Sequence, residues 1–340
     1  MRGDDEIGAP HPPLAVTTLL TIPKAEYSDG LTMLASLSLL SLCSLIVSEA
    51  FLHPAYQPRR ASLRMLTIEQ EETSIGTPSG PMRTAILRPN APGRYPGIVF
   101  YSEIFQLTGP IMRSASVIAG HGFVVAVPEI YHSSSPGWVG GYTTEGADEG
   151  NRLKVTTSVE TYDGDSAAAI EYLKNYPHCT GKIGTAGFCV GGHLSLRAAL
   201  VNDGVHAVAS WYATDIHTGD GVCGGLSDRS KDTMNLFHRL PLNNNGDGTE
   251  VLMIFGKQDR HVDGNGRLKL YQALTDAGAH FEWLEFNGMH AFMRDEGYRY
   301  DPMLEMITFQ HAIALFNRKL HEGDLKAAAP MEKGALNAKM

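Results

Sequence analysis

The stretch Ile183–Leu200, IGTAGFCVGGHLSLRAAL, decides the fold. It joins a short strand-like run to an apolar-periodic helix, with Cys189 between them and a glycine two residues before and two residues after it. This is the nucleophile-elbow pattern with cysteine in the serine position. Gly187 and Gly191 suit such a turn because strand and helix approach each other closely there. A cysteine at a helix N-terminus has its thiolate stabilised by unpaired N–H groups and the helix dipole, so we expect Cys189 to be reactive.

Strand-like and helix-like segments alternate along the chain on both sides of this stretch. We expect strands at 82–87, 97–101, 123–127, 182–185, 207–212, 251–255 and 281–286, helices at 110–121, 162–176, 190–200, 264–277 and 302–320, and long loops at 128–157 and 212–242. Such alternation is typical of an α/β fold with a doubly wound, mostly parallel sheet and helices on both of its faces.

Charge and cysteine content narrow the class of protein. The 340 residues carry 28 Lys and Arg against 37 Asp and Glu, a net charge of −9, so we expect no nucleic-acid partner. The four cysteines form no CxxC pair and no dense disulfide pattern. Cys43, Cys179 and Cys223 are expected to be unreactive, which leaves Cys189 as the working thiol.

Residues 1–64 read differently from the rest and are interpreted as an N-terminal extension, followed by a folded domain at 65–322 and a tail at 323–340. Residues 30–48 carry no charge and are about as long as a bilayer core, but five serines and a threonine dilute their hydrophobicity. The extension is open to three interpretations: a segment without defined structure, a secretory signal or a membrane anchor. We expect a cytoplasmic protein unless residues 30–52 anchor it to a membrane or direct its secretion.

A nucleophile of this kind needs a base and an acid that orients the base. The α/β-hydrolase order is nucleophile, acid, histidine. Asp259 follows the strand-like run VLMIFG, and His290 follows FEWLEF, so both lie at the carboxyl ends of parallel strands, where such sheets bind ligands. Position therefore selects Asp259 and His290 as partners of Cys189, with His261 as the alternative base and Asp263 as the alternative acid.

Five motifs in this order resemble the dienelactone hydrolase (carboxymethylenebutenolidase) family: YSEIFQ with Glu103, VPEIY with Tyr131, GFCVGG with Cys189, GKQDRHV with Asp259 and GMHAF with His290. The resemblance covers about residues 70–320 and does not extend to residues 1–64. It implies a single-domain α/β-hydrolase fold and cleavage of a small ester or lactone through a cysteine thioester, with a Cys-His-Asp triad. No metal or organic cofactor is implied.

The resemblance also implies roles for residues around the triad. Glu103 would hold the thiol in the resting site and release it to the histidine when substrate binds. A carboxylate beside a thiol disfavours a second negative charge, which agrees with that role. The backbone N–H groups of Ile104 and Val190 would form the oxyanion hole.

Substrate recognition is where the chain departs from the family pattern. Family members that act on the acidic dienelactone hold its carboxylate with two arginines. Arg294 matches one of them, but Ser133 stands two residues after Tyr131 where the other would be, and Gln106 replaces a glycine near the pocket mouth. A serine cannot supply the lost charge pair. Candidates for the missing cation are His132, Arg113 and Arg152.

Other hypotheses stay open at this point. One is a catalytically silent small-molecule binding protein of the same fold. Another is a thiol or metal site formed by Cys189 and His193, four residues apart, although two ligands alone make a poor zinc site. A nucleotide-binding role for residues 184–192 is disfavoured because these glycines come after several strands rather than after the first. We expect the protein to be a monomer or a weak dimer. Its expected binding partner is a small-molecule substrate, an ester or a lactone.

Overall fold

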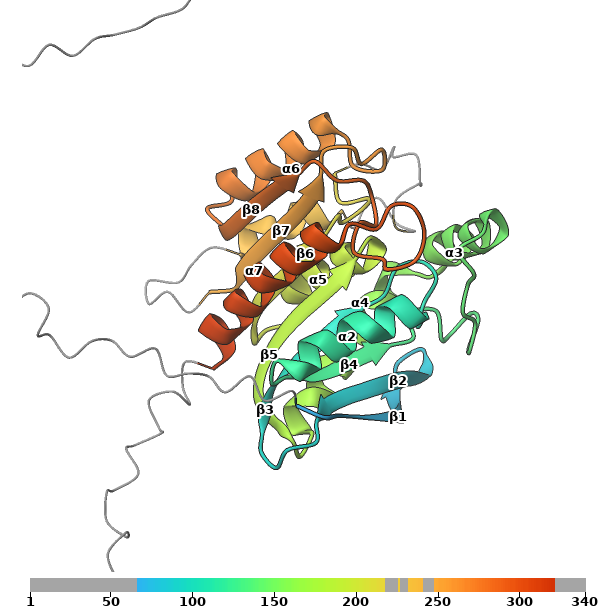
Figure 1. The fold of residues 1–340 in the computed structure, drawn as a ribbon, viewed down its shortest axis with the longest axis vertical. Helices are drawn as coiled ribbons and strands as arrows, with labels where there is room; N and C mark the ends of the chain where they lie inside the picture. Colours follow the sequence, from blue (N-terminus) through green and yellow to red (C-terminus); the bar gives the residue numbers. More distant parts are fainter. Residues whose placement is uncertain (1–65, 218–225, 227–231, 241–247, 322–340) are drawn as a thin grey trace, which may run out of the picture. The chain divides into compact units, whose positions relative to one another are not determined.

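The computed structural model describes residues 66–217, 226, 232–240 and 248–321 (Figure 1). The expected extension at 1–64 with its apolar segment 30–52, the tail at 323–340, and Cys43 and Cys223 lie outside the described residues. Among the helices within the described ranges, none has the length and apolar character needed to cross a membrane.

An eight-stranded open sheet in the order β1-β2-β4-β3-β5-β6-β7-β8 forms the centre of the described part (Figure 1). The strands are β1 Ile68–Thr77, β2 Gly80–Pro89, β3 Tyr95–Tyr101, β4 Val124–Pro128, β5 Cys179–Phe188, β6 Val205–Trp211, β7 Glu250–Gly256 and β8 His280–Phe286. The β1–β2 and β2–β4 pairs are antiparallel, and all other neighbouring strands are parallel. The expected mostly parallel sheet is therefore confirmed.

Helices cover both faces of the sheet, as expected for a doubly wound fold (Figure 1). The helices are α2 Gly109–Gly120, α3 Thr144–Thr156, α4 Val159–Asn175, α5 Val190–Val201, α6 Gly264–Asp276 and α7 Pro302–Leu320, with a short 3-10 helix, η2 Thr233–Arg239. α2 and α7 pack on one face, and α4, α5 and α6 pack on the other. Every residue of β7 is buried, which explains why the central strands read as continuous apolar runs.

The structure differs from the sequence prediction in three places. The sequence pattern does not predict β1, because its residues are mostly polar and half exposed in an antiparallel edge strand. The expected loop at 128–157 contains α3, a polar helix with two glycines whose buried residues are Gly150, Leu153 and Lys154. η2 lies within the second expected loop, at 212–242.

The seating of α7 on the sheet gives a first testable prediction. Phe316 is fully buried, with its ring centroid 5.8 Å from that of Phe123. We expect Phe316→Ala to lower the free energy of unfolding by about 3–5 kcal/mol, because the cavity left behind adds to the lost burial. Urea denaturation measures the change. Met306→Ala, on the exposed side of the same helix, is the control and should change stability by less than about 0.5 kcal/mol; equal losses would contradict the packing described.

Candidate active site

Cys189 occupies a strained turn between β5 and α5. Its φ of 59° and ψ of −121° lie in a region that residues with side chains rarely adopt. A Cβ on Gly187 would lie 2.2 Å from the carbonyl oxygen of Gly191, and a Cβ on Gly191 would lie 2.3 Å from that of Tyr101. The close approach that explains the glycine spacing is therefore present. The cysteine itself is half-buried and lines a pocket.

His290 and Asp259 form a hydrogen-bonded pair beside the cysteine. Asp259 follows β7 and His290 follows β8, and His290 Nδ1 lies 2.7 Å from Asp259 Oδ2. The other carboxylate oxygen, Oδ1, accepts the backbone N–H of His261 at 2.7 Å. Burial alone would raise the pKa of Asp259, but the hydrogen bond with His290 lowers it below its ordinary value. The carboxylate is thus held ionised with its orientation fixed from both oxygens.

The imidazole of His290 lies between two negative groups. Burial acts to lower its pKa, but the charge on Cys189 and the hydrogen bonds with Asp259 and Cys189 outweigh burial and raise the pKa to about 10. The raised pKa favours an imidazolium that is held between the Cys189 side chain and the Asp259 carboxylate. The structure therefore brings the three expected triad residues together.

Two aromatic side chains fix the position of the imidazole further. The ring of Tyr212 meets that of His290 edge-on with centroids 4.9 Å apart, and the ring of His261 lies 4.4 Å away. Burial, together with the charge of His290, lowers the pKa of His261 to about 4. His261, the alternative base, is thus a neutral neighbour of His290, which itself holds the side-chain hydrogen bond to Asp259.

Asp263 and His193 have structural roles outside the triad. Asp263 caps α6, where its Oδ1 accepts the backbone N–H of Gly266 at 2.7 Å. His193 is buried on α5, and its Nε2 lies 2.7 Å from Thr233 Oγ1, which connects α5 to η2. Burial lowers the pKa of His193 to about 3. Asp263 therefore caps a helix, and His193 packs between two helices.

Glu103 lies just beyond the end of β3, buried in the wall of the same pocket. Neither of its carboxylate oxygens has a hydrogen-bond partner among the described residues, and Arg294 Nη1 lies 3.7 Å from Oε2. Burial raises the pKa of Glu103, and the charge of Arg294 offsets only part of the rise. The described residues thus lack the hydrogen bond from thiol to carboxylate that the resemblance implies, so the gating role of Glu103 stays a prediction.

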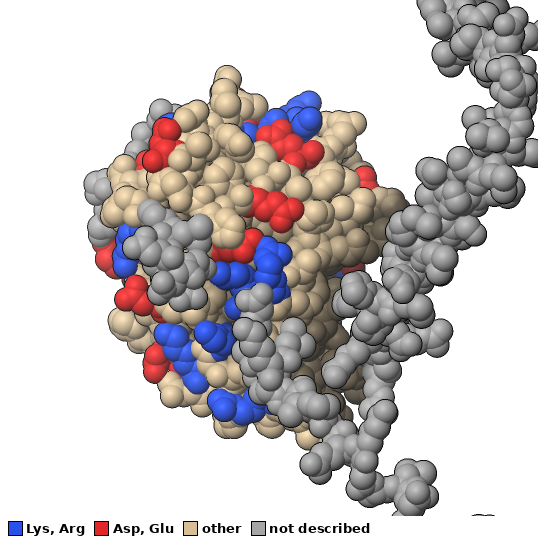
Figure 2. All heavy atoms as spheres, turned by 90° about the vertical axis from the view of Figure 1, so that its left-hand side faces the viewer, with Lys and Arg blue, Asp and Glu red and all other residues tan. Residues whose placement is uncertain are grey.

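A pocket of about 380 Å³ connects these groups. Its lining includes Cys189, His290, Glu103 and Ile104, together with three basic side chains: Lys154, Arg294 and Arg299. On the face of the molecule in Figure 2, by contrast, basic and acidic side chains are interspersed among neutral ones. A chain of net charge −9 thus gathers positive groups around its candidate active site.

Only one of the expected substrate-binding side chains lines this pocket. The guanidinium of Arg294 stacks over the ring of Tyr142, 4.2 Å from its centroid. Tyr131 and Gln106 are fully buried, with Gln106 Oε1 accepting the backbone N–H of Tyr131 at 3.4 Å, and Ser133 is exposed elsewhere. These positions do not support the expected role in substrate binding for Tyr131, Gln106 or Ser133.

The basic residue that sequence reasoning missed is Arg299. The three candidates for the missing cation are paired elsewhere: Arg113 with Asp295 and Glu296, Arg152 with Glu149, and His132 with Asp165. Arg299 lies in the segment between β8 and α7 and lines the pocket together with Arg294. No motif marks this position, and only the path of the segment back over the sheet edge brings the side chain to the site.

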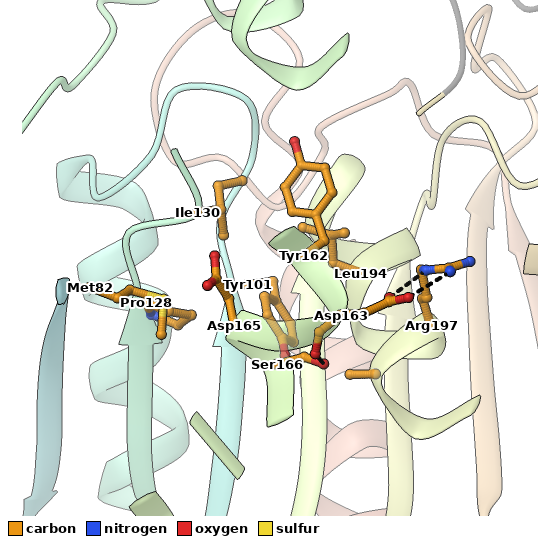
Figure 3. Close-up of a pocket in the computed structure, with 11 residues that line it drawn as sticks. Met82, Tyr101, Pro128, Ile130, Tyr162, Asp163, Asp165, Ser166, Leu194 and Arg197 are labelled. Carbon is orange, nitrogen blue, oxygen red and sulfur yellow. Dashed lines mark hydrogen bonds and ion pairs between the residues drawn. The ribbon is translucent and has the colours of Figure 1, made fainter. Parts of the chain in front are cut away.

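A second cavity lies away from this site, between α4, α5 and the sheet (Figure 3). At about 10 Å³ it has room for about one water molecule. The Arg197–Asp163 ion pair, with Nε and Oδ1 2.7 Å apart, lies at its edge. Its lining includes none of the expected catalytic residues, so it is a packing feature rather than a competing site.

The chain is similar in sequence and in fold to known proteins. The family model described as "Dienelactone hydrolase family" matches residues 82–320. A "Putative carboxymethylenebutenolidase" of Saccharomyces cerevisiae is 35% identical over 262 residues, covering 75% of this chain and 92% of the relative. A "Carboxymethylenebutenolidase" of Pseudomonas putida is 28% identical over 134 residues, covering 38% and 55%. The crystal structure of a "Putative Dienelactone Hydrolase" from Klebsiella pneumoniae shares the fold, with a TM-score of 0.61, 21% identity, and coverage of 74% of this chain and 99% of that one.

The raised pKa of His290 predicts a pH-dependent contribution to stability. Its folded-state pKa of about 10 lies above the ordinary value of 6.5, so the contribution is fully present below pH 6.5 and is lost as the pH rises to about 10. We expect the stability difference between the wild type and His290→Gln to be largest at pH 6 and smallest at pH 10, as measured by urea denaturation. Cys189→Ala should flatten this trend, since the thiolate supplies part of the shift; a difference that grows with pH would contradict the ion pair.

Proposed function

The chain belongs to the dienelactone hydrolase family and is a carboxylic ester hydrolase, and on that premise we propose that it cleaves a small ester or lactone through a thioester on Cys189. The observation that carries the proposal is the 2.7 Å pair between His290 and Asp259 beside a cysteine held in the strained elbow. A nucleophile, a base and an orienting acid in this relation are the parts that acyl transfer requires.

In the proposed first half-reaction, Cys189 Sγ attacks the carbonyl carbon and forms a C–S bond. The carbonyl oxygen takes the negative charge, which the N–H groups of Val190 and Ile104 would stabilise; loss of one such donor typically costs about 10²–10³ in rate. Collapse of this intermediate breaks the C–O bond to the leaving oxygen, which takes the proton from His290. A lactone opens at this step, whereas an ester releases its alcohol.

In the second half-reaction, His290 removes a proton from water as the water oxygen attacks the thioester. A second tetrahedral intermediate forms at the same site and collapses with cleavage of the C–S bond. The products are the carboxylic acid and the Cys189 thiolate, with the proton back on His290. Asp259 keeps the imidazole in one orientation throughout, since its hydrogen bond to Nδ1 leaves Nε2 free for proton transfer.

Glu103 is proposed to gate the thiol. Its carboxylate is buried and its oxygens accept no hydrogen bond from the described residues, so it is available to the Cys189 thiol in a resting arrangement. In the arrangement described, the carboxylate faces Arg294 at 3.7 Å, and the thiolate pairs with His290. The proposed switch is the passage of the thiol proton to His290 as Glu103 leaves Cys189 for Arg294, which produces the thiolate and the imidazolium that the first half-reaction needs.

We propose further that the substrate carries an anionic group. Arg294 and Arg299 both line the pocket, and Arg299 has no ion-pair partner in the described part of the chain. Two guanidinium groups can hold one carboxylate with directed, charge-assisted hydrogen bonds. Arg299 would then supply the second positive charge, which Ser133 cannot provide.

The proposed nucleophile is tested by Cys189→Ala. We expect hydrolysis of p-nitrophenyl acetate to fall by at least about 10³-fold, because removal of a triad nucleophile leaves only binding and the oxyanion hole. Thermal unfolding should show that the variant remains folded. Cys179→Ala, which removes a buried thiol of β5, is the matched control and should keep the wild-type rate; full activity of Cys189→Ala would refute the mechanism.

The proposed anion site is tested by Arg299→Gln. With the acidic dienelactone as substrate, kcat/KM should fall about tenfold or more, the effect of losing one charge-assisted hydrogen bond of roughly 1.5–3 kcal/mol. With a neutral lactone the value should stay within about twofold. Arg113→Gln, an arginine paired outside the pocket, controls for the loss of charge. Equal losses of kcat/KM on the acidic and the neutral substrate would show that Arg299 does not bind the carboxylate.

A further inference from the structure

A buried ion pair in the pocket wall has no part in the mechanism above. Lys154 on α3 and Asp215 in the segment after β6 approach to 2.8 Å between Nζ and Oδ2, and their side chains are 1% and 3% exposed. Taking two charges out of water costs about as much as their attraction returns, so such a pair is weak evidence for a role in stability. Its position, with Lys154 lining the same pocket as Cys189, indicates another role.

The lysine belongs to a helix that lies against the proposed oxyanion hole. α3 extends beyond the ends of the strands, apart from the helices that cover the sheet (Figure 1). One face of it lines the pocket, with residues three or four apart: Thr144, Ala147, Asn151 and Lys154. At its middle, a Cβ on Gly150 would lie 2.6 Å from the carbonyl oxygen of Ile104. A shift of α3 would therefore displace the backbone of Ile104.

The aspartate belongs to a strained segment that contacts both the nucleophile and the base. Tyr212 and Asp215 have φ values of 38° and 66°, in the left-handed region, at a cost of about 1–3 kcal/mol each. The backbone N–H of Thr214 donates to the carbonyl oxygen of Cys189 at 3.3 Å, and the ring of Tyr212 packs against His290. Such strain persists only where the surroundings hold the backbone in place.

α3 has few other attachments along its length. At its N-terminal end, the hydroxyls of Tyr142 and Thr108 form a hydrogen bond of 2.7 Å. Toward its C-terminal end, Lys154 is fixed by Asp215 and by the Tyr162 hydroxyl, which donates to the Lys154 carbonyl oxygen at 3.1 Å. Leu153, next to Lys154, is the one large apolar side chain of α3 that is fully buried, so apolar packing holds the helix at a single point beside the ion pair.

We propose that Lys154 and Asp215 are positioning residues that fasten the oxyanion side of the site to its nucleophile side. The ion pair ties α3, which packs on Ile104, to the segment that contacts Cys189 and His290. It thereby sets the spacing between the thiolate and the N–H group that receives the developing charge. The inference rests on the proposed function of Cys189 and adds two residues that touch none of the reacting atoms.

The test removes both charges at once with Lys154→Met/Asp215→Asn, so that neither charge is left buried without a partner and residue 215 keeps a side chain that tolerates its φ of 66°. We expect backbone amide exchange in residues 144–156 to become at least about tenfold faster. We expect kcat for p-nitrophenyl acetate to fall about tenfold or more, since a displacement of about 1 Å can cost 10²-fold. The KM for this small neutral ester should change by less than about threefold, because the pair binds no part of it.

The matched control is Arg197→Met/Asp163→Leu, which removes an ion pair of similar length at the separate cavity in Figure 3. It should leave both kcat and the exchange of α3 at wild-type values. Lys154→Arg, which keeps a cation opposite Asp215, should recover most of kcat. If that variant fails to fold, Lys154→Gln/Asp215→Asn, which puts neutral polar side chains at both positions, should show a smaller rise in exchange and a smaller loss of kcat.

The outcomes separate this inference from the proposed function. Wild-type exchange and kcat in the folded Lys154→Met/Asp215→Asn variant, or an equal loss of kcat in the Arg197→Met/Asp163→Leu control, would overturn the positioning role. Amide exchange needs no turnover, so it tests the tie between α3 and the segment after β6 by itself. Hydrolysis that persists in Cys189→Ala would instead overturn the thioester mechanism.

Discussion

At Gly187 the backbone of β5 meets that of α5, and at Gly191 the backbone of α5 meets the end of β3, so closely that no side chain fits at either glycine. This contact forces the residue between them into a backbone conformation with φ of 59°, and it places that residue beyond the carboxyl edge of the sheet. The start of α5 then presents the N–H of Val190 beside the thiol. Much of the candidate site is a consequence of this one turn, because the thiol, the helix N-terminus and the first proposed oxyanion donor are set by the same few dihedral angles.

Parallel register supplies the remaining parts of the triad. β7 and β8 end together, with Gly256 opposite Phe286. Asp259 and His290 follow within four residues of these ends, so their side chains meet without any long connection. Residues far apart in sequence therefore reach the same edge of the sheet, because their strands are parallel and end at the same level.

This geometry also explains what the sequence could and could not predict. Asp259 and His290 were predictable because apolar runs mark their strands and the edge of a parallel sheet is a fixed place. α3 was not, because its glycines and polar residues give no helical pattern, and its position depends on the contact of Gly150 with Ile104 and on the burial of Lys154. Arg299 was missed for a similar reason, since only the tertiary path of its segment brings it to the pocket.

The gathering of cations in the pocket bears on the end of the catalytic cycle as well as on its start. Hydrolysis of an ester or lactone creates a carboxylate, so the product carries one more negative charge than the substrate. In the proposed mechanism that charge would form in the pocket lined by Arg294 and Arg299. The same field that draws an anion in also holds the product back. Under the proposed mechanism, release of the acid would therefore limit turnover, and salt that screens its attraction to these cations would weaken that limit.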